Sequence, residues 1–356
     1  MNNKHKAIKR YWRNPEKFDV LELFDAIGRS RKLTLGNEDD ISTFTNIISD
    51  SLSKNNYNTM IYGKRVEAMF AYMVASLGKC LLVKKEDGGD VFVVDTYIEI
   101  PDYRIILADD SQMLVEVKNH HPKDISGEYS MDANYLAGLS KYADMMKVDL
   151  RVAIYWSQLN KWTLLSISDF EDKGNKSVVS LNNAMKRNQM STLGDVLIGT
   201  VPPLIIRLNA DKTKESRLAE NNSAHFTIKS VEFLCNNKII KCPDEQRIAY
   251  ALICYGSWED EQTEATLDDT MQIECVEFSY SPSDSNMGIQ GFDIVDLLSA
   301  IVSRQYGELT APKGKVDRLS PDVDPGLLGF IIPDDYQGID LPLWRFRIEP
   351  SLDGKS

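Results

Sequence analysis

The 356-residue chain is predicted to adopt an α/β fold, in which a mixed central sheet is flanked by helices and is followed by a second, α+β domain. Two observations support this prediction. Apolar residues recur at helical spacing in residues 63–77 and 131–146, and short β-branched and aromatic runs lie between and after these segments. In addition, a further set of strands and helices begins near residue 223, after a polar stretch.

The first half alternates helices and strands in an order that favours one sheet covered by helices. Residues 1–55 are expected to be mostly helical, with helices at 20–27 and 41–52. The next helix, 63–77, ends at Gly78. The expected elements after it are strands at 80–83, 91–94, 103–107 and 113–117, a helix at 131–146, and strands at 150–156 and 161–167.

The second half contains its own regular pattern. Residues 173–222 are expected to form a polar connector, interrupted by the apolar stretch 196–206. In 223–356, Asn236-Asn237 predicts the turn of a hairpin. The expected elements are strands at 225–234 and 238–241, a helix at 245–255, a strand at 271–280, a helix at 292–306 and a strand at 343–348. Because no catalytic motif is recognisable here, we expect a recognition or assembly domain.

Composition and charge restrict the class of protein. The net charge of −12 argues against a general DNA-coating protein, because phosphate binding needs basic surface. The charge is uneven, with five cations and no acid in residues 1–13 and seven acids in residues 258–274. The basic arm could contact nucleic acid or simply keep the terminus soluble. The acidic stretch is expected to be a solvated loop, which could also screen an active site.

Cysteine usage and hydropathy indicate a cytoplasmic protein. The five cysteines contain no C-x-x-C pair, which is typical of reduced thiols and argues against a zinc site. No apolar run is long enough to span a membrane, and the N-terminus lacks an apolar signal core. We therefore expect no membrane partner.

The predicted hairpin at 103–117 brings two acids and a lysine together. A turn at 108–111 would place residues whose numbers sum to 218 opposite each other, and Asp102 and Glu116 form such a pair. Lys118 lies two residues after Glu116 and shares its face. Two close carboxylates repel each other unless a cation lies between them. The alternative is an exposed hairpin with a surface ion pair, because Pro-Asp also occurs at three other places in the chain.

The flanking segments add a family resemblance. The motifs Gly63-x-x-x-Glu67, Pro101-Asp102 and Glu116-x-Lys118, in this order of helix and strands, resemble the PD-(D/E)xK nuclease superfamily. The closest likeness is to the compact core of archaeal Holliday-junction resolvases and restriction-endonuclease-like proteins. It covers roughly residues 55–170, so we assign 56–172 to a restriction-endonuclease-like core. Many relatives carry a glutamine near the start of the second helix, where this chain has Asn134-Tyr135.

The resemblance implies a role for each motif residue. Asp102 and Glu116 would be metal ligands, Lys118 the catalytic lysine, and Glu67 the helix acid. Together with the Val117 carbonyl, the two acids are oxygen ligands suited to Mg²⁺ or Mn²⁺. Glu67 could also hold a second metal through water. His120 and His121 follow Lys118 and are expected to be ordinary loop residues, although they could bind phosphate.

These residues predict a metal-dependent nuclease that hydrolyses phosphodiester bonds, with DNA favoured as substrate. The biological context would be the effector of a defence or mobile-element system. Two alternatives stay open: a non-catalytic nucleic-acid-binding relative, and a subunit of a larger complex with a protein partner on residues 223–356. A homodimer is one expected arrangement, because resolvase-like and restriction-like cores often pair to cut two strands.

Overall fold

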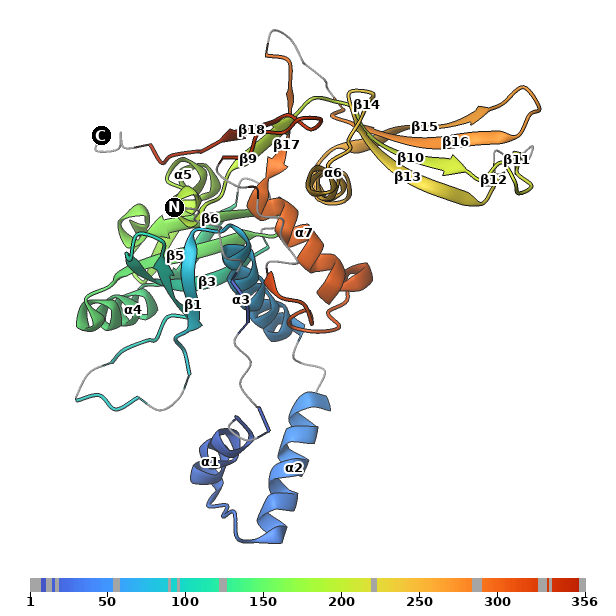
Figure 1. The fold of residues 1–356 in the computed structure, drawn as a ribbon. Helices are drawn as coiled ribbons and strands as arrows, with labels where there is room; N and C mark the ends of the chain where they lie inside the picture. Colours follow the sequence, from blue (N-terminus) through green and yellow to red (C-terminus); the bar gives the residue numbers. More distant parts are fainter. Residues whose placement is uncertain are drawn as a thin grey trace.

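The protein has a central α/β body, from which an N-terminal helical hairpin and a long β-sheet arm extend in different directions (Figure 1). The computed structural model describes residues 8–10, 15–16, 19–53, 58–88, 91–94, 97–121, 127–218, 223–283, 290–325, 332 and 335–351. No helix in these ranges is both long enough and apolar enough to cross a membrane.

A five-stranded mixed sheet forms the centre of the body, in the order β1-β2-β3-β5-β6. Its strands are β1 (Cys80–Lys85), β2 (Tyr103–Leu107), β3 (Gln112–His120), β5 (Asp149–Trp156) and β6 (Lys161–Ser166). Neighbouring strands are antiparallel except β3 and β5, which are parallel. A parallel pair requires a crossover connection, and here it contains β4 (Glu128–Asp132) and the helix α4 (Ala133–Met146). The predicted mixed α/β core is therefore present.

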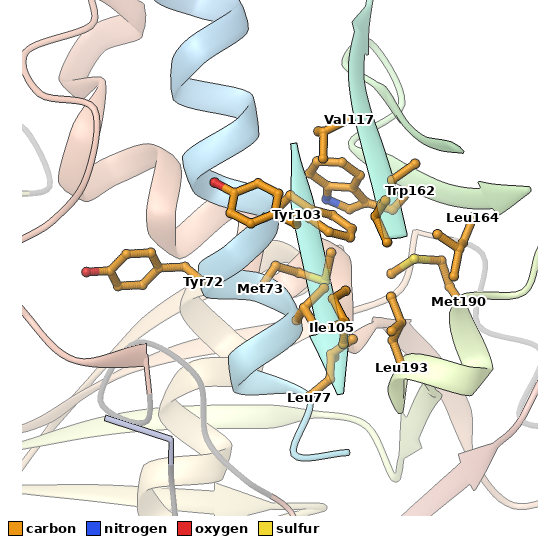
Figure 2. Close-up of a cluster of buried hydrophobic side chains, with 14 of the residues drawn as sticks. Tyr72, Met73, Leu77, Tyr103, Ile105, Val117, Trp162, Leu164, Met190 and Leu193 are labelled. Atoms are coloured by element: carbon orange, nitrogen blue, oxygen red, sulfur yellow. The ribbon is translucent and has the colours of Figure 1, made fainter. Parts of the chain in front are cut away.

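Alternating side chains on β3 pack into two separate cores. Val115 and Val117 point to the face covered by α3 (Asn58–Ser76) and α7 (Leu298–Thr310). Figure 2 shows this cluster, which includes Met73 of α3 and Trp162 of β6. Phe70 of α3 contacts Trp162, with ring centroids 5.5 Å apart. Leu114 points to the opposite face, which α4 covers. Glu116 and Lys118 lie two and four residues after Leu114 on the same strand. Their side chains therefore point to the same face of the sheet as Leu114, the face that α4 covers.

The N-terminal helices agree with the sequence pattern. They are α1 (Asp19–Arg31) and α2 (Glu38–Ser53), which lie beside each other as a hairpin in Figure 1. Phe24 of α1 contacts Phe44 of α2, with ring centroids 5.0 Å apart.

Two expected elements of the first half differ from the structure. Residues 91–94, predicted as a strand, form no regular element. The helix predicted from 131 begins instead at Ala133, because Met131 and Asp132 belong to β4. The carboxylate of Asp132 accepts hydrogen bonds from the backbone N–H groups of Asn134 and Tyr135, which caps the helix N-terminus.

Residues 173–222, expected as a connector, are mostly regular structure. They contain β8 (Lys176–Ser180), α5 (Leu181–Lys186), the 3₁₀ helix η3 (Met190–Leu193), β9 (Leu197–Thr200), β10 (Leu204–Ala210) and β11 (Arg217–Leu218). β8 lies between β4 and β7 (Glu171–Asp172) in a three-stranded sheet. Short strands among polar residues carry little apolar periodicity, which is why their pattern resembles a connector.

The arm is a second five-stranded antiparallel sheet, in the order β14-β13-β10-β16-β15. Its other strands are β13 (Ile228–Cys235), β14 (Lys238–Ile239), β15 (Glu259–Leu267) and β16 (Ile273–Ser281). Asn236 and Asn237 have positive φ angles of 47° and 62°, so the predicted hairpin turn is present. Because β10 is the middle strand, the boundary expected near residue 223 divides a single sheet.

Three further features complete the arm and its base. β12 (Ala224–His225) pairs with β11, and α6 (Pro243–Tyr255) matches the helix expected at 245–255. The acidic stretch expected as a loop forms β15, an exposed edge strand. β15 lies in the arm, away from α4 and β3, so it does not cover that end of the body (Figure 1).

The helix expected at 292–306 is a strand followed by a helix. Residues of β17 (Asp293–Leu297) pair with β9, whose other neighbour is β18 (Leu343–Phe346). α7 then begins at Leu298. The backbone N–H and the hydroxyl of Ser299 both donate to the buried Asp195 carboxylate, at 2.9 and 2.6 Å. The remaining short helices are η2 (Ile167–Asp169) and η4 (Pro312–Gly314).

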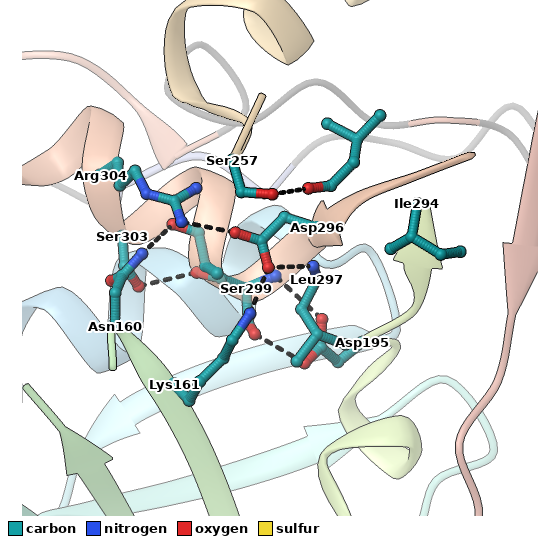
Figure 3. A network of polar contacts seen from close by, with 12 residues as sticks. Asn160, Lys161, Asp195, Ser257, Ile294, Asp296, Leu297, Ser299, Ser303 and Arg304 are labelled. Atoms are coloured by element: carbon teal, nitrogen blue, oxygen red, sulfur yellow. Dashed lines mark hydrogen bonds and ion pairs between the residues drawn. The ribbon is translucent and has the colours of Figure 1, made fainter. Parts of the chain in front are cut away.

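α7 joins the two halves of the chain into one structure. Its residues Leu298, Val302 and Tyr306 belong to the same buried cluster as α3 and the central sheet. The buried Asp296, just before α7, pairs with Lys161 of β6 and with Arg304 (Figure 3). Residues 223–356 therefore share a hydrophobic core with the predicted core domain, which differs from the expected separate unit.

Candidate active site

The hairpin of β2 and β3 has the register expected from the sequence. Tyr103 lies opposite Val115 and Ile105 opposite Met113, so paired residue numbers sum to 218. The turn is closed by a 2.9 Å hydrogen bond from Leu107 N–H to the Ser111 carbonyl, and Asp110 adopts a left-handed conformation with φ of 65°. Asp102, directly before β2, is thereby brought beside the middle of β3.

The Asp102 side chain is buried and bound to the next strand. Its Oδ2 accepts a 2.8 Å hydrogen bond from the backbone N–H of Val117. Burial, together with the negative charge of Glu116, raises the pKa of Asp102 to about 7. The backbone hydrogen bond acts in the opposite direction but does not outweigh these two effects.

Glu116 is the most deeply buried acid of the site, with 2% of its surface exposed. Its Oε1 accepts a 2.7 Å hydrogen bond from the Tyr135 hydroxyl and lies 2.5 Å from the Lys118 ammonium. Its Oε2 is buried and has no hydrogen-bond partner among the described residues. A buried carboxylate oxygen without a partner is costly, and a bound cation would supply the missing interaction.

Lys118 and Tyr135 complete the polar side of the site. The Lys118 Nζ lies 4.7 Å from the centroid of the Tyr135 ring and 3.5 Å from its hydroxyl. Burial and the charge of Glu116 raise the pKa of Tyr135 well above its usual range, so this hydroxyl keeps its proton. The Asp132 cap places Tyr135 in the first turn of α4, directly above Glu116.

Glu67 lines the same cavity but is engaged elsewhere. It lies on α3, and its Oε2 forms a 2.7 Å ion pair with Lys64. In this arrangement the described residues contain no group of three His, Cys, Asp or Glu side chains close enough to hold a metal ion. The metal role expected for Glu67 stays a prediction.

These side chains surround a cavity of about 510 Å³. Its charged lining residues are the acids Glu67, Asp87, Glu99, Asp102 and Glu116 and the lysines Lys64 and Lys118. The excess of acids disfavours a bare phosphate and favours a cation. A divalent cation bound here would make the cavity attractive to phosphate, since metal ions are usually the largest local charge of a site.

The residues fit a magnesium-type ion. Mg²⁺ is commonly held by one or two carboxylates while it keeps several waters, and Asp102 and Glu116 supply two. Burial and then repulsion by Glu116 raise the pKa of Asp102, and Oε2 of Glu116 has no partner among the described residues; a cation between the two carboxylates would offset the repulsion and supply that partner. A third protein carboxylate is therefore not required.

Sequence reasoning overlooked several cavity residues. In the sequence, Tyr135 is only a departure from the family pattern, yet its hydroxyl donates a hydrogen bond to Glu116. Lys64 lies one helical turn before Glu67, and this spacing in the sequence predicts that the two side chains are neighbours. His120 packs against Trp156, with ring centroids 5.0 Å apart, and His121 Nδ1 is 2.8 Å from the Ser157 hydroxyl. Neither histidine lines the cavity. His121 lies outside the regular elements, as expected, whereas His120 is the last residue of β3 and not a loop residue.

The fold and site thus define a mixed α/β protein with two buried carboxylates and a lysine at one cavity. No family model matches the chain, and no curated protein sequence matches it. Among solved structures, the chain is similar to Hjc, a Holliday junction resolvase of the archaeal hyperthermophile Archaeoglobus fulgidus. The sequence identity is 13% and the TM-score 0.29, over 37% of this chain and 96% of the resolvase.

Proposed function

We propose that the protein is a metal-dependent nuclease, with DNA favoured over RNA as its substrate. The observation that carries the proposal is the Glu116 carboxylate. It is buried beside Asp102, and one of its oxygens has no hydrogen-bond partner in the described part of the chain, while the other contacts Lys118 and Tyr135. A purely structural ion pair would leave no such oxygen unsatisfied.

Each residue has a distinct part in this proposal. Asp102 and Glu116 would hold Mg²⁺ or Mn²⁺, which polarises a phosphoryl oxygen and lowers the pKa of a bound water. The N–H and C=O of one extended residue leave on the same side of the strand. Val117, whose N–H meets Asp102, would therefore direct its carbonyl toward the same place.

Lys118 would act on the substrate rather than on the fold. Its ammonium can orient the attacking water or stabilise the charge that develops on the phosphorane. Tyr135, which stays protonated, would hold Glu116 in place. Glu67, once separated from Lys64, could bind a second ion through water.

The direct test is cleavage by the purified full-length protein. Supercoiled plasmid, single-stranded DNA and RNA are incubated with Mg²⁺ or with EDTA, and we compare wild type with Asp102→Asn and Glu116→Gln. We expect Mg²⁺-dependent cleavage that both variants lose, and retention of cleavage by the control Asp149→Asn, whose exposed carboxylate pairs with Arg151. Wild-type rates in either site variant would show that the assignment is wrong.

A second candidate function is that of a nuclease-fold subunit in a larger complex, acting mainly in nucleic-acid binding or assembly. The observation in its favour is that Lys118 already neutralises Glu116, while the cavity rim and the whole chain are acidic. Native mass spectrometry with and without DNA separates the two. A subunit would bind DNA only with a partner and show no cleavage, whereas a nuclease cleaves alone.

A further inference from the structure

A second, smaller cavity lies where the central body meets the β9–β18 sheet, and its lining is basic. It has a volume of about 130 Å³ and shares no lining residue with the cavity around Glu116. Three cations line it: Lys79 after α3, and Arg345 and Arg347 at the end of β18. None of its lining residues is an Asp or Glu. In a chain with a net charge of −12, such a lining is unusual.

One wall of this cavity is a tight turn that only glycine permits. Gly194 has a φ of 101°, and a Cβ there would lie 2.7 Å from the Leu77 carbonyl oxygen. This close approach holds η3 against the end of α3. Ser191, on η3, accepts a 3.1 Å hydrogen bond on its carbonyl from Nη2 of Arg347. The turn and the arginine therefore form one continuous wall.

The Ser191 hydroxyl provides an independent sign of a ligand. The residue is 3% exposed, lines the cavity, and its Oγ has no hydrogen-bond partner among the described residues. A buried hydroxyl without a partner costs roughly 1–3 kcal/mol. A ligand oxygen that accepts a hydrogen bond from this hydroxyl, beside the cations of the lining, would supply the missing partner of Ser191 Oγ.

We propose that this cavity binds the terminal phosphate of a small phosphate compound. Its volume of about 130 Å³ leaves room for a tetrahedral phosphoryl group. Arginine binds phosphate through paired N–H donors. Arg347 has five such donors, and its contacts with Glu349 and Ser191 engage two of its nitrogens. The remainder of the ligand would project outside.

The cavity lies between elements from both halves of the chain. Leu77 and Lys79 follow α3, Ser191 is on η3, Leu298 begins α7, and Arg345 belongs to β18. A bound phosphate would bridge β18 to the body, so it should slow hydrogen exchange of the amides at 343–347.

The test titrates the full-length protein with inorganic phosphate at constant ionic strength, using isothermal titration calorimetry and hydrogen exchange. We expect saturable binding and slower exchange at 343–347. Arg347→Gln and Ser191→Ala should each weaken binding on the order of tenfold, as expected for a lost hydrogen bond to a charged group. Arg347→Lys keeps the charge but not the paired donors. Its affinity for phosphate should lie between the affinities of these two variants and that of wild type.

The matched control is Arg247→Gln, which removes an exposed arginine on α6 that pairs with Asp244. It should bind phosphate as wild type does. Three results would overturn the proposal: no saturable binding, equal binding by wild type and Arg347→Gln, or binding of a 5′-phosphorylated oligonucleotide without any binding of free phosphate. Because none of these measurements involves cleavage, they are independent of the proposed nuclease activity.

Discussion

The Tyr135 hydroxyl donates a 2.7 Å hydrogen bond to Oε1 of Glu116, across the gap between α4 and β3. The same oxygen faces the Lys118 ammonium, so one carboxylate oxygen is saturated while the other has no partner among the described residues. This asymmetry orients Glu116, because rotation of the carboxylate would break two interactions. The tyrosine therefore acts on the proposed metal site through Glu116.

We expect Tyr135→Phe to lower the affinity for Mg²⁺ by about 10- to 100-fold, as other outer-shell substitutions do. The phenyl ring keeps its contact with Lys118, whereas the hydroxyl's hydrogen bond to Glu116 and its weaker one from Lys118, at 3.5 Å, are lost. The measurement is the cleavage rate as a function of Mg²⁺ concentration. Tyr142→Phe is the control, because it removes a hydroxyl from the same helix that binds Glu86 instead. Equal Mg²⁺ dependence in both variants would remove Tyr135 from the site.

Lys118→Met should separate metal binding from catalysis. The ammonium lies 2.5 Å from Glu116 and competes there with any bound cation. Its removal should therefore tighten Mg²⁺ binding by calorimetry while abolishing cleavage, because no group remains to stabilise the developing charge. Lys173→Met, which breaks an exposed pair with Glu128, should change neither property. Weaker metal binding in Lys118→Met would indicate a structural role.

Local sequence patterns predicted the elements that are long and periodic. The β2–β3 hairpin follows from its turn and its alternating apolar residues, and its register places Asp102 beside Glu116 without further information. α3 has an apolar stripe that fills the core of Figure 2; it begins at Asn58, five residues before the predicted start at 63, and ends at Ser76, one residue before the predicted end at 77.

Nonlocal partners explain what the sequence did not predict. The sequence predicts β17 as part of a helix because Ile294 and Val295 continue an apolar run. In the structure these residues form a strand because they pair with the distant β9. The connector contains β10, whose two partner strands, β13 and β16, both come more than 15 residues later in the chain. In the site, Tyr135 meets Glu116 only because the Asp132 cap starts α4 at that point.

The repulsion between Asp102 and Glu116 should appear as a pH-dependent stability. Folding raises the pKa of Asp102 to about 7, against about 3.9 in the unfolded chain. The folded state then binds the proton more tightly, so stability falls as pH rises from about 4 to about 7. Asp102→Asn removes this dependence while its side-chain oxygen can still accept from Val117.

We therefore expect Asp102→Asn to raise the melting temperature in EDTA at pH 8, and to have little effect at pH 5. Mg²⁺ at pH 8 should stabilise wild type and leave the variant unchanged. Asp109→Asn is the control with the opposite sign, because hydrogen bonds from Ser111 lower the pKa of Asp109. If Asp102→Asn and wild type have the same melting temperature at both pH values, the predicted repulsion between the Asp102 and Glu116 carboxylates is wrong.

The last prediction concerns the shared core. A fragment ending at residue 172 loses α7, whose Leu298, Val302 and Tyr306 are each at most 4% exposed against α3 and the sheet. It also loses Met190 and Leu193 from the same cluster, and the Ser303 hydroxyl that accepts from the Trp162 indole N–H at 2.9 Å. Each large side chain uncovered forfeits roughly 1.5–3 kcal/mol, and domains of this size are stable by only about 5–15 kcal/mol.

Such a fragment should be insoluble or molten, and the full chain should unfold with α3 and α7 in one transition. Hydrogen exchange along a denaturant series measures this directly, and the variant Val302→Ala, which keeps the chain intact, should lower the protection of both helices together. The exposed Val231→Ala in β13 is the control and should affect neither. If the fragment is soluble with native protection in α3, or if α7 loses protection well before α3, the two halves are separate folding units after all.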